Sequence, residues 1–173
     1  MRPVNQLDKK DLIDLLNKCW MTHDGMWFFH CAQEFGMEKA NQLNKAAIRS
    51  LAPIEVGRIR KVLEMGEGRI DTFEELRELL SGAFALVAPD FMGGSMSFPR
   101  KNVFHWEFEP GNCFAYKGMK RIGVIDKYEC GVMYRVACWI DSLGIGYEMR
   151  PEIEGCMMLS TGHCSGDFIL DLG

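Results

Sequence analysis

The chain has 173 residues, of which 47% are hydrophobic and 25% charged, a composition typical of one globular domain with a substantial core. Its net charge of -4 argues against nucleic acid as the main partner, and no uninterrupted apolar stretch is long enough to span a membrane. The N-terminal segment lacks the apolar core of a signal peptide, so we expect a cytoplasmic protein. Its seven cysteines should then be thiols, metal ligands or buried apolar groups.

The first half of the chain predicts helices, because apolar residues recur there at helical spacing. Thr22, His23 or Asp24 is expected to cap the second helix, and Thr72 to cap the fifth. Pro53 suits the first turn of the fourth. The expected helices cover residues 8–20, 22–35, 37–51, 53–65 and a segment that begins after 72.

The second half changes character near Pro89 and predicts strands around a long helix. The clearest strand has Phe104, Trp106 and Phe108 on one face, and the other face carries Val103, His105, Glu107 and Glu109. The expected strands are 91–98, 102–109, 146–150, 155–160 and 168–172. A short helix is expected over 114–123, with a strand as the alternative there, and a long helix over 126–143. We therefore predict a single α+β domain over 1–173. Its helical layer, 1–88, precedes an antiparallel sheet with a long packed helix, 89–173.

Three cysteines form the first candidate site. Cys130 is expected at the start of the long helix, while Cys156 and Cys164 would flank the turn of the final hairpin. Thiolates that meet in this way suit a zinc ion, with a fourth ligand from nearby residues. The candidates for that ligand are Glu129, Glu152, Glu154 and His163. The alternative is that each cysteine is simply a buried apolar group.

An aromatic and titratable segment, 20–30, forms the second candidate site. On a helix His23, Trp27 and His30 share one face and would line a small-molecule pocket, with Asp24 beside them. The alternative is an ordinary capped amphipathic helix. Trp106 is expected either to pack in the core or to line the same cavity.

The second half resembles the 4-vinyl reductase domain, a small-molecule-binding module. The resemblance rests on Cys113 and Gly118, on Gly123-Val124 before the long helix, and on the segments 155–156 and 162–168. It implies an apolar ligand cavity and a homodimer formed through N-terminal helices. It also implies a structural zinc ion on Cys130, Cys156 and Cys164 with a glutamate. Ile153 stands where that glutamate is expected, between Glu152 and Glu154, and we take Glu154 as the fourth ligand.

Over its full length the chain resembles an uncharacterised family of anaerobic bacterial and archaeal proteins, and its layout is similar to that of a family of amino-thiazoline-carboxylate hydrolases. The motifs that carry this resemblance are Trp20, His23-Asp24-Gly25, Trp27-Phe28, Tyr128-Glu129-Cys130-Gly131, Arg135, Trp139, Leu143-Gly144 and Gly155-Cys156-Met157-Met158.

The leading expectation is a cytoplasmic small-molecule-binding protein with a zinc ion in a structural role. One alternative is a hydrolase of a small cyclic or amide substrate that uses His23, Asp24 or Cys31. The other is a structural or interaction subunit, which predicts an exposed apolar patch and no enclosed pocket.

Overall fold

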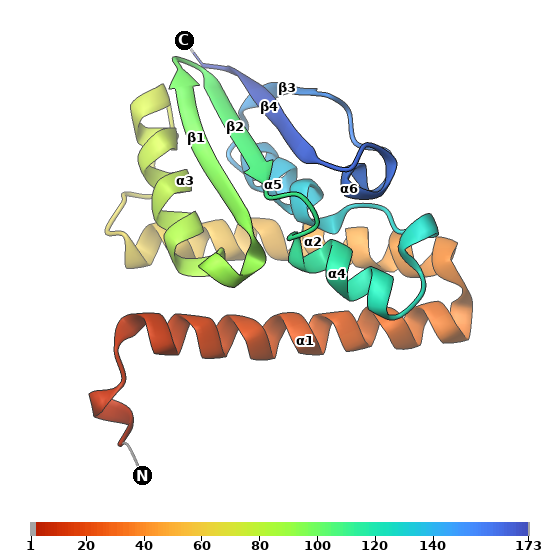
Figure 1. Ribbon diagram of the computed structural model, residues 1–173. Coiled ribbons are helices and arrows are strands. Elements are labelled where there is room, and N and C mark those ends of the chain that lie inside the picture. The colour runs from red at the N-terminus through yellow and green to blue at the C-terminus, as the bar shows by residue number, and fades with distance from the viewer. Residues whose placement is uncertain (1–2, 173) are drawn as a thin grey trace.

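The computed structural model describes residues 3–172. N-terminal helices precede a four-stranded antiparallel sheet that has helices packed against it, which confirms the predicted α+β class (Figure 1). The helices are α1 (Lys9–Phe35), α2 (Met37–Val62), α3 (Phe73–Val87), α4 (Phe114–Arg121), α5 (Gly131–Ser142) and α6 (Met157–Ser160). The strands are β1 (Gly94–Arg100), β2 (Val103–Phe108), β3 (Gly146–Arg150) and β4 (Cys164–Asp171). Short 3-10 helices cover Val4–Gln6, Asp90–Met92 and Ile125–Lys127.

The two helices expected before Gly36 are one continuous helix, α1, so the prediction of a cap at residues 22–24 is wrong. The cap lies at Asp8, whose Oδ1 accepts a hydrogen bond from the Asp11 amide at 2.7 Å. Polar residues cap a helix only where the backbone leaves the helical conformation. Here α1 packs along α2, and buried Phe28 anchors its second half to the fold.

Helix α2 likewise runs through Pro53 without a break, although a new helix was expected to start there. Proline removes one helical hydrogen bond, and this one is removed on the solvent side because Pro53 is exposed. Buried Ala52, Val56 and Ile59 hold the opposite side of α2 against the core. Tertiary packing therefore outweighs the local signal.

The expected cap at Thr72 is confirmed. The Glu75 amide donates to Thr72 Oγ1 at 3.2 Å, and the Thr72 amide donates to Glu75 Oε2 at 3.1 Å. This reciprocal capping box satisfies two donors of the first turn of α3.

The strands lie in the order β1-β2-β4-β3, and each neighbouring pair is antiparallel. The expected strand over 155–160 is wrong, because that segment contains α6. Its backbone closes helical bonds instead, with the Thr161 amide donating to the Met157 carbonyl at 2.8 Å. β3 ends at Arg150, before Pro151. After α6 the chain returns as β4, which lies between β2 and β3 in the sheet.

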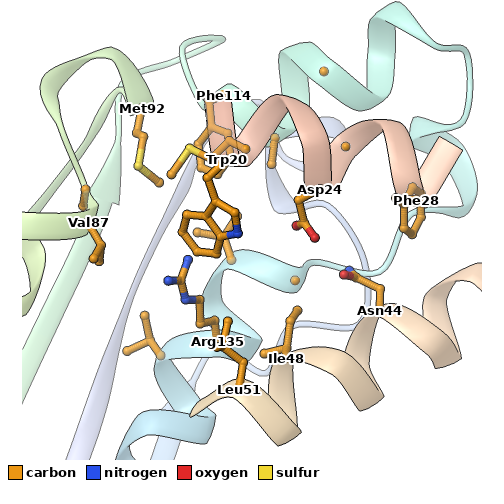
Figure 2. Close-up of a pocket in the computed structure, with 18 of the residues that line it drawn as sticks. Trp20, Asp24, Phe28, Asn44, Ile48, Leu51, Val87, Met92, Phe114 and Arg135 are labelled. Carbon is orange, nitrogen blue, oxygen red and sulfur yellow. The ribbon is translucent and has the colours of Figure 1, made fainter. Parts of the chain in front are cut away.

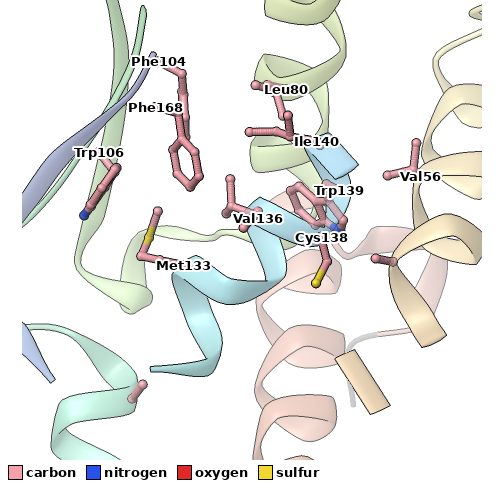
Figure 3. Close-up of a cluster of buried hydrophobic side chains, with 14 of the residues drawn as sticks. Val56, Leu80, Phe104, Trp106, Met133, Val136, Cys138, Trp139, Ile140 and Phe168 are labelled. Carbon is pink, nitrogen blue, oxygen red and sulfur yellow. The ribbon is translucent and has the colours of Figure 1, made fainter. Parts of the chain in front are cut away.

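The core lies where α5 packs between the sheet and the helical layer (Figure 3). Phe104, Trp106 and Phe168 extend from the sheet toward one side of α5, while Val56 and Leu80 approach from α2 and α3. Ile140 and Phe168 have no measurable solvent exposure. Within the described part of the chain, no helix combines the length and the apolar character needed to cross a membrane.

Candidate functional site

A cavity of about 250 Å³ lies where the helical layer meets α4 and α5 (Figure 2). Its walls are mainly apolar and come from α1, α2, α4 and α5, together with the end of α3. The apolar lining includes Phe28, Ile48, Leu51, Val87, Met92 and Phe114. The polar side chains at the cavity come from different elements: Asp24 from α1, Asn44 from α2 and Arg135 from α5.

Arg135 is fixed at the wall by an ion pair and two indole rings. Its Nε donates to Glu55 Oε2 at 2.8 Å, and its Nη2 donates to Glu55 Oε1. The guanidinium lies 4.2 Å from the ring centroid of Trp20 and 5.3 Å from that of Trp139. Trp139 Nε1 also donates to Glu55 Oε2 at 2.7 Å. This arrangement forms part of the cavity wall, and the charge of Glu55 neutralises that of Arg135.

Asp24 points from α1 into the space above α2 and α5, toward Asn44 (Figure 2). Although its residue is solvent-accessible overall, partial burial raises the pKa of its carboxyl, and the charges of Arg135 and His23 oppose that rise. Its side chain makes no hydrogen bond or ion pair with the described residues. Asp24 is therefore a solvent-accessible carboxylate at the edge of an apolar space, with no partner among the described residues.

Gly131 forms a tight corner of the cavity beside Tyr128. The Gly131 amide donates to Tyr128 Oη at 3.0 Å, and burial raises the pKa of the Tyr128 hydroxyl. A Cβ atom at position 131 would lie 2.9 Å from Asn44 Nδ2 and 3.1 Å from Ile48 Cδ1. Only glycine leaves room there for α2 and α5 to approach each other.

The predicted ligand residues lie in different places. Asp24 lines the cavity, whereas His23, Trp27 and His30 are exposed on α1 and do not line it. Trp106 is 1% exposed and packs against Phe168 in the core. Of the residues named for the hydrolase alternative, His23, Asp24 and Cys31, the cavity lining includes Asp24.

Sequence reasoning missed Glu55 and Arg135 as site residues, and it included Trp20 within segment 20–30 without giving it a role of its own. One signal was present: Trp20 and Asp24 are four residues apart and so share a helix face, the face that lines the cavity. Glu55 and Arg135 are 80 positions apart, and nothing in either local pattern indicates that they pair.

Three of the cysteines precede helices: Cys113 before α4, Cys130 before α5 and Cys156 before α6. Cys164 begins β4. Burial raises the pKa of the Cys130 thiol to about 12, and Cys113 and Cys164 add to the rise. Burial likewise raises the pKa of Cys164 to about 11, with further contributions from Cys113 and Cys156. These mutual effects place the four cysteines, called the thiol cluster below, in one neighbourhood.

Neighbouring N–H groups favour the charged form of these thiols. The amides of Met133 and Val132 oppose part of the rise in the Cys130 pKa. The indole of Trp106 acts in the same direction on Cys164. Trp106 Nε1 is buried and has no hydrogen-bond partner of ordinary geometry. A thiolate at Cys164 would supply the acceptor for its N–H group.

The thiol cluster is looser than a formed metal site. Among residues 3–172, no group of three or more His, Cys, Asp or Glu side chains is positioned to hold a metal ion. Glu154, the expected fourth ligand, is exposed, whereas Cys113 is buried beside the other thiols. All seven cysteines are free thiols.

Comparison with known proteins gives one family. Residues 5–85, just under half of the chain, match DUF6125, which is described as a family of unknown function. No curated protein matches the chain. No solved structure matches it either.

Proposed function

We propose that the protein binds a small, mainly apolar molecule in the cavity between α1, α2, α4 and α5. The observation that carries the proposal is the cavity itself: an apolar space with a few converging polar groups, Asp24, Asn44 and Arg135. This combination is the usual character of a small-molecule site, in which apolar walls supply affinity and polar groups set orientation.

Two further observations support the proposal. The motifs around Cys130 and Cys164 resemble those of the 4-vinyl reductase domain, whose role is to bind small molecules. Phe114, Ala115, Gly131 and Val132 line the cavity and directly follow two cysteines of the thiol cluster.

The test is binding of small aromatic molecules, followed by native mass spectrometry and by quenching of tryptophan fluorescence. Ala47 lines the cavity and Ala46 is exposed beside it. Ala47→Trp should fill the space and abolish binding, while Ala46→Trp should bind as the unchanged protein does. Equal binding by both variants would place the ligand elsewhere and defeat the proposal.

We also propose that the thiol cluster holds a structural zinc ion, with Cys113 completing the set of Cys130, Cys156 and Cys164 in place of Glu154. Four thiolates are a common ligand set for structural zinc. The sulfurs would have to move together on metal binding. The unpaired indole N–H of Trp106 and the first-turn amides of α5 would then stabilise metal-bound thiolates. The ion would join the starts of α4 and α5, two walls of the cavity.

Elemental analysis of freshly purified protein tests this proposal, with an expected one zinc per chain. Cys164→Ser and Cys113→Ser should each release the metal and lower the melting temperature. Cys138→Ser is the matched control, because Cys138 is equally buried but has no part in the cluster. Metal-free wild-type protein, or full metal content in both variants, would contradict the proposal.

A homodimer formed through α1 is the third part of the proposal. One side of α1 carries apolar and histidine side chains that are spaced alternately four and three residues apart, as in the seam of a coiled coil. We call these residues the α1 stripe, and they are Leu12, Leu16, Cys19, His23, Met26 and His30. Leu16 is 67% exposed, and Trp27 beside the stripe is 63% exposed. Helix α1 forms the outer edge of the molecule (Figure 1).

The surface area of one chain leaves room for an interface of standard size, which a second copy would occupy in the proposed dimer. The chain exposes 10439 Å², whereas a folded monomer of 19.7 kDa is expected to expose about 8,600 Å². The difference exceeds the roughly 800 Å² that each partner buries in a standard interface. Sedimentation at several concentrations measures the oligomeric state, and a monomer at all concentrations would exclude the dimer.

A further inference from the structure

The charges around the cavity are unequal, and this inequality restricts the ligand. Of the described residues that line the cavity, Asp24 and Arg135 carry the formal charges. Glu55 lies behind Arg135 and accepts from its Nε at 2.8 Å and from its Nη2. The site therefore has one cation and two carboxylates, and the cation is already paired.

Arg135 is poorly placed to receive an anionic ligand. Two of its donors are used by Glu55, and the face of its guanidinium lies 4.2 Å from the Trp20 ring. A ligand carboxylate would have to compete with Glu55 and would also approach Asp24. Both effects disfavour acids, because like charges at short range in an apolar setting repel strongly.

Asp24 has the opposite character, because its carboxyl projects toward Asn44 and makes no hydrogen bond or ion pair with the described residues. Asp24 is exposed, so water hydrates its carboxylate when no ligand is bound, and an ammonium group that replaced this water would form a charge-assisted hydrogen bond at the edge of the apolar cavity. The same cavity has apolar walls, to which Ile48, Leu51 and Phe114 contribute.

We propose that the cavity selects a small apolar amine, whose ammonium group binds between Asp24 and Asn44 while its hydrocarbon or aromatic body lies against the apolar wall. This inference rests on the proposed ligand-binding function and names the chemical class of the ligand. Hydrogen bonds to charged groups are among the stronger ones in proteins, so an amine should bind about tenfold more tightly than the alcohol of the same skeleton.

Three probes with one body test the inference: 2-phenylethylamine, 2-phenylethanol and 3-phenylpropionate, with dissociation constants from titration calorimetry at neutral pH. The expected order of affinity is amine, then alcohol, then acid. Asp24→Asn should remove the advantage of the amine over the alcohol. Glu34→Gln is the control, because it removes one charge from an exposed position of the same helix.

The outcomes separate this inference from the function on which it rests. If the alcohol or the acid binds as tightly as the amine, or if Asp24→Asn keeps the preference, the amine inference is overturned while ligand binding stands. If none of the three probes binds, both proposals fail. If Glu34→Gln lost as much amine affinity as Asp24→Asn, the loss would reflect the net charge of the protein, and the role of Asp24 would also be overturned.

Discussion

Helices α5 and α1 both carry many apolar residues, but they use them differently. In α5, Met133, Val136 and Ile140 are buried between the sheet and the helical layer (Figure 3). In α1, Leu16 and Trp27 remain largely exposed. The core of one chain therefore explains the composition of α5, whereas the exposed apolar residues of α1 are the ones that the proposed dimer would cover.

The largest expected effect comes from truncating a side chain of α5. Ile140→Ala removes a fully buried side chain from the contact between α5 and the core, and should lower the free energy of unfolding by about 2–5 kcal/mol. Urea denaturation measures the change. Leu16→Ala on α1 is the comparison, because Leu16 is mostly exposed, and in the monomer its effect should stay within about 0.5 kcal/mol. Equal losses would mean that α1 is part of the core.

The next effect concerns the corner where α2 meets α5. Gly131→Ala would place a methyl group 2.9 Å from Asn44 Nδ2 and 3.1 Å from Ile48 Cδ1. Overpacking of this kind typically costs about 1–3 kcal/mol. Because both neighbours line the cavity, ligand affinity should fall as well. Gly118→Ala also changes a cavity glycine but meets no atom within 4 Å, so it should preserve stability. Similar melting temperatures for the two variants would contradict the tight corner.

The sequence predicted the elements whose signals are local. Thr72 and Glu75 lie three residues apart and form the expected capping box. Phe104, Trp106 and Phe108 alternate along β2 and are all buried, as expected. Local signals failed at Pro53, where burial of the opposite side of α2 keeps the helix continuous.

The candidate site was less predictable because its groups meet across the fold. The stack of Trp20 on Arg135 and the ion pair of Arg135 with Glu55 join three helices, α1, α2 and α5. Periodicity describes each helix by itself and does not show which faces meet. Cys113 was overlooked for the same reason, because its proximity to Cys130 depends on how α4 and α5 begin.

A smaller effect on the free energy of the single chain is expected for the outer face of α1. Trp27→Glu places a charge beside the α1 stripe, where Trp27 is 63% exposed in one chain. If α1 pairs with a second copy, the dissociation constant of the dimer should rise at least about tenfold, since buried tryptophans often dominate interfaces. Analytical ultracentrifugation measures this change. Lys61→Gln on the exposed part of α2 is the control, because it also lowers the net charge by one unit, and an equal shift there would point to net charge instead.

The smallest expected effect comes from Asp24, and its dependence on pH has a definite sign. Burial holds the pKa of Asp24 above its ordinary value in the folded state, against the charges of Arg135 and His23. Such a carboxyl favours the folded state when protonated, and this contribution is lost as the pH rises from the unfolded pKa through the folded one. Asp24→Asn should therefore raise the melting temperature slightly at neutral pH and have no such benefit in acid, where Asp24 is already protonated. A lower melting temperature at neutral pH would show instead that the Asp24 carboxylate stabilises the protein through Arg135. In that case the cavity would offer no unpaired charge to a ligand.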